Sequence, residues 1–432
     1  MQSSPSADRH PVRQHSAGGD GPSSAGDGAP APRLSGEAAL RLAAVVAVLA
    51  AALLTACGCA DHSAWLQREL RAAAARSLLF WRPAPAGHWQ PLGHHRPPLA
   101  ELIDQLERFP SPEEFFSRYV RPQRPVVFRG LAGVHPAYWL WTDDYLRREF
   151  GSVELDVEQK KKEDRSIGLT RMNVSEFLSV YKEKDLYVVH SIQEEMRRDL
   201  ALLPSAQCGG LQRLMMDAVL WFSSGGTKSV LHYDELDNIN CVLDGYKHFF
   251  LVDVDDAHHI EFDHMEGLYS SVDVTSVDMY RFPGLRDVPW YNVTLWKGDC
   301  FYLPFRWPHH VISSNSRNVA VNLWFSRLLW FNESECSDFR VSEHASLSDF
   351  DPAEDADLQR AHLVARAEDS EQLTLLAFAD LYSDALPDDD EAAEAAFDQL
   401  DADGDGLLQL PEMYKFEAVK FLRLFPRYER RD

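Results

Sequence analysis

Two histidines and an aspartate are the residues in this sequence whose types and spacing best suit metal chemistry. His232 and Asp234 are separated by a single residue. Alternate side chains of a strand share one face, so both can point into the mouth of a barrel together. A further histidine, His309 or His310, lies near the end of the aromatic-rich segment LPFRWPHHV at residues 303–311. A His-x-Asp pair alone is common by chance, but the pair followed by such a segment is far more specific.

This set of ligands predicts an iron site. Two imidazoles and one carboxylate that leave three coordination positions open form the facial triad of non-haem Fe(II) oxygenases. The open positions are what the chemistry requires, because a 2-oxo acid fills two of them and dioxygen fills the third. We therefore expect Fe²⁺ at His232, Asp234 and one of the two later histidines.

A second metal motif lies near the C-terminus, where residues 401–412 read DADGDGLLQLPE. This segment matches the calcium loop of an EF-hand at every diagnostic position. The expected calcium ligands are Asp401, Asp403, Asp405, the carbonyl group of Leu407 and a bidentate Glu412. Helices are expected at 391–400 and 412–422, and residues 373–390 are a candidate for a degenerate partner hand. We expect Ca²⁺ to stabilise this region and not the iron site.

The elements that must position the iron ligands are mostly short strands. Helical patterns at 111–119 and 141–150 flank a short strand at 124–130. Runs of β-branched and aromatic residues then predict strands at 187–189, 219–222, 247–252, 295–296, 300–303 and 319–325. Many short strands at this spacing favour a sandwich or jelly roll, an architecture that includes the cupins. We expect a mainly β fold with flanking helices, and helices again after residue 352.

From residue 110 to residue 327, about half of the chain, the sequence resembles the JmjC oxygenases. It is most similar to the branch of small hydroxylases that includes factor-inhibiting HIF. The resemblance rests on the run HYDE at 232–235, on Asn238 and on the run GYK at 245–247. It implies a double-stranded β-helix that binds Fe²⁺ and 2-oxoglutarate. It also implies His309 as the third iron ligand, because the family's ligand falls five residues after the proline that matches Pro304.

The same resemblance assigns side chains to the cosubstrate. It implies that Lys247 pairs with the distal carboxylate of 2-oxoglutarate, where a point positive charge is the expected partner. Ser229 would form a hydrogen bond with that same carboxylate. Tyr187, Asn238 and Asn322 match further polar positions near the cosubstrate and the iron.

Two tryptophans and two departures from the family pattern complete the expected pocket. Trp324 matches a wall of the pocket, whereas we expect Trp221 to be an ordinary core residue. Ser229 stands where some relatives have threonine, which costs a methyl contact. Pro308 replaces a more typical aromatic residue just before the third iron ligand.

The sequence before the expected oxygenase domain has three parts. Residues 1–37 are rich in Ser, Gly, Pro and Ala and predict a disordered tail. Residues 38–60 carry no charge after Arg41 and approach the ~20 apolar residues that span a bilayer. We expect an uncleaved signal-anchor rather than a cleaved signal peptide, because the preceding tail is far longer than a normal n-region. Residues 61–95 form a stalk, 96–345 the JmjC domain and 346–432 a helical region with the EF-hand loop.

The sequence also predicts a compartment. Three Asn-x-Ser/Thr sequons follow the anchor, at Asn173, Asn292 and Asn332. They are usable only if this part of the chain is lumenal, so we expect a single-pass type II membrane protein of the endoplasmic reticulum or secretory pathway. Four cysteines lie in the same part: Cys208, Cys241, Cys300 and Cys336. They fit buried thiols or up to two disulfides, and we take buried thiols as the default.

The net charge of −24 argues against a protein that holds nucleic acid through a basic face. The expected partners are 2-oxoglutarate, dioxygen and a protein substrate, with a homodimer as a further expectation. Protein hydroxylation is the leading hypothesis for function. Lysine demethylation by the same chemistry is disfavoured, because no histone-reader module, zinc-binding cysteine cluster or basic nuclear signal accompanies the motifs. A non-catalytic, calcium-responsive binding protein is the third hypothesis, and the intact iron ligands together with Lys247 argue against it.

Overall fold

The structure is a computed structural model, and it describes residues 84–100, 103–159, 168–263, 268–342, 345–370, 372–387 and 389–428. The chain divides after Pro83 into two units, and the described residues all belong to the second, Ala84–Asp432. The expected tail (1–37), the expected signal-anchor (38–60) and most of the expected stalk lie outside the described residues. Within the described part, no helix is both long enough and apolar enough to cross a membrane.

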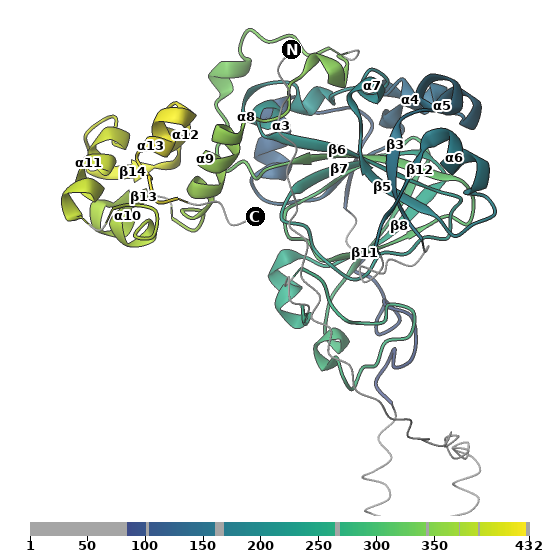
Figure 1. Cartoon of the computed structure of the whole chain (residues 1–432). Coiled ribbons are helices and arrows are strands. Elements are labelled where there is room, and N and C mark those ends of the chain that lie inside the picture. The colour runs from purple at the N-terminus through teal and green to yellow at the C-terminus, as the bar shows by residue number, and fades with distance from the viewer. Residues whose placement is uncertain are drawn as a thin grey trace, which may run out of the picture. The chain divides into compact units, whose positions relative to one another are not determined.

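Two β-sheets form the core of the second unit (Figure 1). Among the described residues, the larger sheet has nine strands in the order β1-β2-β10-β7-β12-β6-β5-β3-β4. They are β1 (Asp104–Leu106), β2 (Val126–Phe128), β3 (Glu154–Glu158), β4 (Thr170–Asn173), β5 (Tyr187–Ser191), β6 (Met215–Ser223), β7 (Asp237–Asp244), β10 (Cys300–Leu303) and β12 (Asn318–Phe325). The smaller sheet has the order β11-β8-β9, made of β8 (Tyr246–Leu251), β9 (Tyr291–Trp296) and β11 (His309–Ser313). The predicted mainly β, jelly-roll fold is confirmed.

The inner faces of the two sheets enclose an apolar layer. One hydrophobic cluster contains Val242 and Phe301 of the larger sheet together with Phe249 and Leu295 of the smaller sheet. Gly245 turns the chain from β7 in one sheet to β8 in the other, with a φ of +76°. A Cβ at this position would lie 2.5 Å from a serine hydroxyl oxygen, so the turn requires glycine.

An extended segment before β7 adds to the smaller sheet. Lys228 pairs with Ile312, and His232 pairs with His309 at the start of β11. The backbone N–H of each histidine donates to the carbonyl group of the other, at 3.1 and 2.7 Å. This antiparallel bridge sets side by side two expected iron ligands that are far apart in the sequence.

The compact unit includes part of the segment that was expected to be a stalk. The expected stalk runs to residue 95, but the compact unit starts at Ala84. Within it, the backbone N–H of Trp89 donates to the carbonyl group of Val277, and that of Leu92 donates to Val274, both at 2.8–2.9 Å. These bonds go to a distant irregular loop, so the segment carries no periodic pattern that could reveal its folded state.

The helices that accompany the sheets are short. They are α3 (Pro112–Phe115), α4 (Ala137–Leu140), α5 (Asp143–Phe150), α6 (Val174–Val180), α7 (Glu194–Arg197) and α8 (Gly209–Arg213). The short turns are η1 (Phe116–Val120), η2 (Leu131–Val134), η3 (Pro204–Ala206), η4 (Val254–His259), η5 (Pro283–Arg286), η6 (Glu333–Cys336) and η7 (Leu347–Asp349). The helix expected at 141–150 is α5, and the Thr142 hydroxyl caps it by accepting from the Tyr145 N–H. The pattern expected at 111–119 is α3 followed by the π-helical turn η1.

Two helix–loop–helix units make up the C-terminal region. The first consists of α9 (Asp355–Ala365), β13 (Gln372–Thr374) and α10 (Leu375–Leu381). The second consists of α11 (Asp390–Leu400), β14 (Leu407–Gln409) and α12 (Leu410–Lys415), followed by α13 (Ala418–Arg423). The strands β13 and β14 pair antiparallel, with Leu373 opposite Leu408. The residues expected to form a degenerate partner hand, 373–390, thus include most of β13 and all of α10, and α9 precedes them.

The four cysteines form two disulfides, so the default expectation of buried thiols is wrong. Cys241 and Cys300 face each other directly across the antiparallel pair β7–β10. Cys208 precedes α8, and its partner Cys336 ends η6. Pairing of this kind follows from strand register and from the path of the chain, which a cysteine count does not contain.

Candidate active site

The three expected iron ligands meet at one point. Nε2 of His232 lies 3.9 Å from Oδ1 of Asp234, and Nε2 of His309 lies 3.7 Å from Oδ2 of the same carboxylate. One ligand atom from each residue lies within 4.8 Å of those of the other two. These side chains converge as the two imidazoles and one carboxylate of a metal centre should.

Hydrogen bonds to the backbone orient both imidazoles. Nδ1 of His232 lies 2.9 Å from the carbonyl oxygen of Val230, and Nδ1 of His309 lies 2.9 Å from that of Trp307. Each Nδ1–H therefore donates to a carbonyl group, which leaves the lone pair of Nε2 for a metal. His310 is also buried, but it lies outside the ligand group, and its Nδ1 is 2.9 Å from the carbonyl oxygen of Ser229. The geometry agrees with the choice of His309 over His310.

The ligands open into a cavity of about 300 Å³. All five residues expected to contact the cosubstrate line this cavity: Tyr187, Ser229, Asn238, Lys247 and Asn322. Trp324 lines it as well, as the family pattern implied. Trp221 also lines the cavity, which corrects its expected place in the core.

Lys247 is the most informative of these residues. Its side chain is 3% exposed, and Nζ lies 5.7 Å from the centre of the Trp221 ring. It takes part in no salt bridge among the described residues. Burial alone lowers the pKa of this ammonium group to about 8. A buried cation is costly without a counter-ion, so the cavity suits an anionic ligand.

A family model described as a cupin-like domain matches residues 112–329, half of the chain. The chain belongs to the cupin-like domain family. Lysine-specific demethylase 8 of Xenopus tropicalis is 27% identical over 228 residues, covering 50% of this chain and 51% of that protein. The bifunctional peptidase and (3S)-lysyl hydroxylase of Homo sapiens is 27% identical over 270 residues, covering 53% and 84%. tRNA wybutosine-synthesizing protein 5 of Gallus gallus is 27% identical over 262 residues, covering 52% and 76%. The match covers about half the length of the demethylase and most of the length of the other two relatives.

Several described side chains that line the cavity of this cupin-like domain have buried polar atoms without a hydrogen-bond partner. Among the described residues, four of its lining side chains carry a buried polar atom without a hydrogen-bond partner: Trp221 Nε1, Asn238 Oδ1, Asn240 Oδ1 and Trp324 Nε1. Asn240 Nδ2 does donate to Asn322 Oδ1, at 2.5 Å. Buried polar atoms are normally paired, so these groups fit a polar ligand beside a metal. With the His/His/Asp donor set and Lys247, the cavity fits Fe²⁺ and a small dicarboxylate.

The hydroxyl groups beside Lys247 were only partly foreseen. The Ser229 hydroxyl accepts from the Val311 N–H at 2.9 Å and donates to the Val230 carbonyl group at 3.0 Å. Thr227 Oγ1 donates to Ser313 Oγ at 2.8 Å, and Ser313 lies directly opposite Lys247 in the sheet. Thr227 and Ser313 both line the cavity and were missed, as were Asn240 and Glu158. Alternation from Ser229 along the extended segment could have found Thr227, but Ser313 carries no such signal.

The acidic loop at 401–412 connects α11 to α12. One carboxylate oxygen each from Asp401, Asp403 and Glu412 lies within 4.8 Å of the others. Asp405 lies outside this group, and its Oδ1 accepts from the Leu407 N–H at 2.8 Å. The two carboxylate oxygens of Glu412 accept backbone N–H groups at 2.7 and 2.9 Å. Three of the four expected carboxylate ligands therefore lie close together, whereas the carboxylate of Asp405 is hydrogen-bonded to the backbone of the loop.

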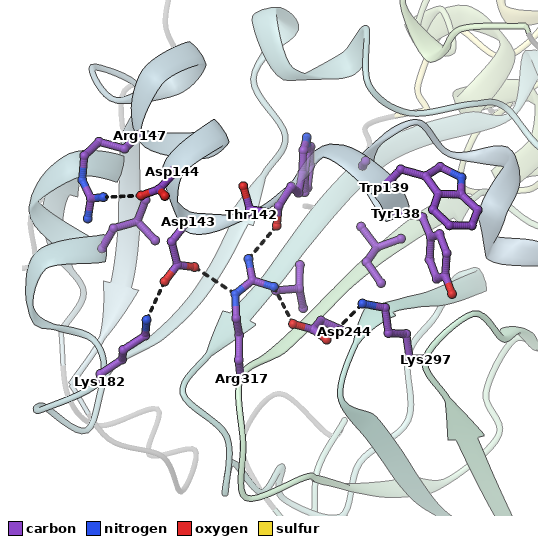
Figure 2. A pocket seen from close by; sticks show the side chains of 15 residues that line it. Tyr138, Trp139, Thr142, Asp143, Asp144, Arg147, Lys182, Asp244, Lys297 and Arg317 are labelled. Carbon is purple, nitrogen blue, oxygen red and sulfur yellow. Dashed lines mark hydrogen bonds and ion pairs between the residues drawn. The ribbon is translucent and has the colours of Figure 1, made fainter.

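Figure 2 shows the side chains around a larger cavity, of about 520 Å³. The two β-sheets form a barrel, and this cavity lies at the end of the barrel opposite the iron ligands. Asp244 ends β7 and Arg317 precedes β12, whereas the iron ligands lie beside the start of β7. Asp143 pairs with Lys182 at 2.8 Å and with Arg317 at 2.9 Å, and Asp244 pairs with Arg317 at 2.7 Å and with Lys297 at 3.4 Å. These charges satisfy one another, in contrast to Lys247, so they need no ligand.

His135, Cys241 and Cys300 form another group of side chains that could hold a metal. All three are buried. The two sulfur atoms are joined in a disulfide, so neither is available as a thiolate ligand. This group is part of the core of the fold.

Proposed function

We propose that this chain is an Fe(II)- and 2-oxoglutarate-dependent oxygenase that hydroxylates a protein side chain. The observation that carries the proposal is the buried Lys247, which shares a cavity with His232, Asp234 and His309. A metal triad alone could serve several purposes. A triad next to an unpaired buried cation suits a cosubstrate that chelates the metal at one end and carries a carboxylate at the other.

The roles of the residues follow from where they lie. His232, Asp234 and His309 would hold Fe²⁺, which when bound supplies the activation of dioxygen at the expense of 2-oxoglutarate. Lys247 would neutralise the distal carboxylate, with the hydroxyls of Thr227 and Ser313 beside it. Tyr187 would complete this end of the cavity from β5. The walls of Trp221 and Trp324 would keep bulk water away, which strengthens each of these charge interactions.

Hydroxylation of a protein is favoured over demethylation and over action on nucleic acid. Of the three relatives described above, one is named as a lysyl hydroxylase, one as a lysine-specific demethylase and one as a tRNA wybutosine-synthesizing protein. The net charge of −24 is unfavourable for a polyanion. The four cysteines described here form disulfides, so they do not build the zinc module of a histone reader. A homodimer stays a prediction.

The proposed function is tested with the purified chain, Fe²⁺, 2-oxoglutarate and a library of peptides from lumenal proteins. The expected product is a peptide that has gained one oxygen atom, detected by mass spectrometry, in step with succinate. Release of formaldehyde from methyl-lysine peptides, with no stable gain of oxygen, would favour the demethylase instead. Calcium binding without consumption of 2-oxoglutarate on any peptide would favour the non-catalytic binding protein.

We further propose that residues 401–412 are an EF-hand loop that binds Ca²⁺, and we expect calcium to stabilise the hand. Asp401, Asp403 and Glu412 bring like charges together, and a bound cation would cancel their repulsion. A ligand that binds only the folded form adds about 2.7 kcal/mol when its free concentration is a hundredfold above the dissociation constant. Hydrogen exchange across residues 391–422 should therefore slow when calcium is added.

The matched variant for this calcium prediction is Glu412→Gln. The substitution keeps the size of the side chain but removes the bidentate carboxylate, so the calcium effect on exchange should disappear. Asp398→Asn is the control, since Asp398 lies on α11 outside the loop. Equal calcium protection in the wild type and in Glu412→Gln would show that the loop is not the binding site.

We also propose a type II membrane protein with a lumenal catalytic domain. Expressed in animal cells, the protein is expected to resist carbonate extraction and to shift in mobility when N-glycans are removed. Asn292 is exposed on β9 and is the best acceptor. Asn173 and Asn332 are only partly exposed, and their side-chain oxygens cap α6 and η6. Asn292→Gln should thus remove most of the shift, and full solubility with no glycan would contradict the topology.

A further inference from the structure

The first helix–loop–helix unit has no acidic residue at either end of its loop, and it contacts the β-sheets. Because Leu373 pairs with Leu408, Arg366 takes the place of Asp401 in this loop, Glu368 that of Asp403, and Ala377 that of Glu412. A guanidinium and a methyl group at the two end positions cannot bind calcium. Arg366 pairs with Asp384 of the same unit, at 2.6 Å. Glu368 instead pairs with Arg327, which follows β12 of the barrel.

Arg327 reaches the segment that leads to the third iron ligand. Its guanidinium carbon lies 4.7 Å from the centre of the Phe305 ring. The backbone N–H of Phe305 donates to Oδ1 of the buried Asp237, at 3.0 Å. Arg327 therefore covers Phe305, which lies four positions before His309 and is held by a partly buried hydrogen bond.

The next residue of this segment is strained and is tied directly to an iron ligand. Arg306 has a φ of +59°, which is unfavourable for a residue with a Cβ and persists only where the surroundings hold it. Its backbone N–H donates to the carbonyl group of Asp234 at 2.9 Å, and its side chain pairs with Glu235. Its guanidinium carbon lies 4.9 Å from the Phe305 ring, near the same ring as Arg327.

The second unit contacts the barrel as well. Tyr414 lies two residues after Glu412, the expected bidentate calcium ligand, and its hydroxyl accepts from the Leu329 N–H at 3.2 Å. Arg360 of α9 donates to the carbonyl groups of Tyr414 at 3.2 Å and Phe416 at 2.7 Å. The helix that leaves the calcium loop is thus joined both to the barrel and to the helix that precedes Glu368.

We propose that Arg327 is a positioning residue for the iron site. We further propose that calcium bound in the loop 401–412 stabilises the contact of Arg327 with residues 304–308. The proposal rests on the calcium assignment made above. Calcium would fix Glu412 and α12, and through Arg360 the first unit, so that Glu368 keeps Arg327 over Phe305. Iron affinity and calcium affinity then rise together, because a coupling between two sites is reciprocal. This proposal differs from the sequence-based expectation that calcium leaves the iron site unchanged.

The test is hydrogen exchange at the amides of Phe305 and Arg306 in the full chain, with calcium and after its removal. The Phe305 N–H donates to Asp237 Oδ1 and the Arg306 N–H to the Asp234 carbonyl group, so both amides report on this segment without any turnover. In the wild type, exchange is expected to be about five- to tenfold faster without calcium, at the lower end of typical coupling between sites. In Arg327→Met, exchange should be fast and insensitive to calcium. Glu368→Gln should behave in the same way, although it leaves the barrel unchanged.

Arg366→Met is the matched control, because it breaks an ion pair of the same loop that does not reach the barrel. This variant should keep the calcium response of Phe305 and Arg306. A calcium titration by calorimetry on the same samples separates the two ideas. Calcium binding with no change at either amide would overturn the coupling alone, whereas absence of calcium binding would overturn both the calcium site and the coupling. A response lost equally in Arg366→Met would assign the effect to general loosening of the hand and contradict the role of Arg327.

Discussion

His232→Ala and Asp234→Ala are each expected to abolish iron binding and succinate formation while the fold stays intact. The ligand atoms lie within 4.8 Å of one another, and each imidazole is already oriented by a backbone carbonyl group. Removal of an outer partner of a metal site typically costs 10–100-fold in affinity, so loss of a ligand itself should exceed roughly 100-fold. Iron content after anaerobic loading, thermal unfolding and succinate yield are the measurements.

The two adjacent histidines provide the internal control for this experiment. His309→Ala should lose iron as completely as His232→Ala, whereas His310→Ala should keep most of it. His310 contacts the Ser229 carbonyl group and lies outside the group of ligands. Iron retained in His309→Ala and lost in His310→Ala would mean that the third ligand has been assigned to the wrong residue.

The second large effect is expected at Lys247. Lys247→Met keeps most of the side-chain volume but removes the buried positive charge, so the KM for 2-oxoglutarate should rise. Loss of one partner from a buried charge pair costs about 2–5 kcal/mol, which corresponds to roughly 30-fold to several thousandfold. Lys297→Met is the matched control, since Lys297 is half-exposed and pairs with Asp244 away from the iron site. An unchanged KM in Lys247→Met would place the cosubstrate elsewhere.

The KM for 2-oxoglutarate should also depend on pH through the charge on Lys247. Burial lowers the pKa of Lys247 to about 8, so the ammonium is fully charged below that pH and loses its proton above it. A dianionic cosubstrate binds the form of the protein in which Lys247 is charged. The affinity for 2-oxoglutarate should therefore be high below pH 8 and fall as the pH rises above 8. The KM should then rise by about tenfold per pH unit in this range. Lys247→Met has no proton to lose, and its KM should be flat over the same interval.

The sequence predicted the chemistry of the site better than its surroundings. His232 and Asp234 could be recognised because the two-residue period of a strand is local, and His309 because the family spacing places it. Thr227 and Ser313 could not, since single hydroxyls carry no motif and reach Lys247 only through strand register. The same register decides that Cys241 meets Cys300, which a count of cysteines does not contain.

The starts of the compact unit and of the first helix–loop–helix unit could not be predicted, for a related reason. The segment from Ala84 onward folds against residues 274–290 through backbone hydrogen bonds, which need no hydrophobic period. The first helix–loop–helix unit was not recognised before residue 373, because Arg366 and Ala377 stand in its loop where the second loop has Asp401 and Glu412. In both cases the local structure depends on contacts with residues far away in the sequence, which a local sequence pattern cannot reveal.

Turnover of 2-oxoglutarate to succinate by the purified chain is the measurement that tests the central claim most directly. The reaction is run with Fe²⁺ and oxygen, without added peptide and then with candidate peptides. We expect succinate that requires Fe²⁺, increases with a true substrate, and is absent from Asp234→Ala. Iron-loaded wild-type protein that forms no more succinate than Asp234→Ala, with any peptide, would contradict the assignment as an oxygenase.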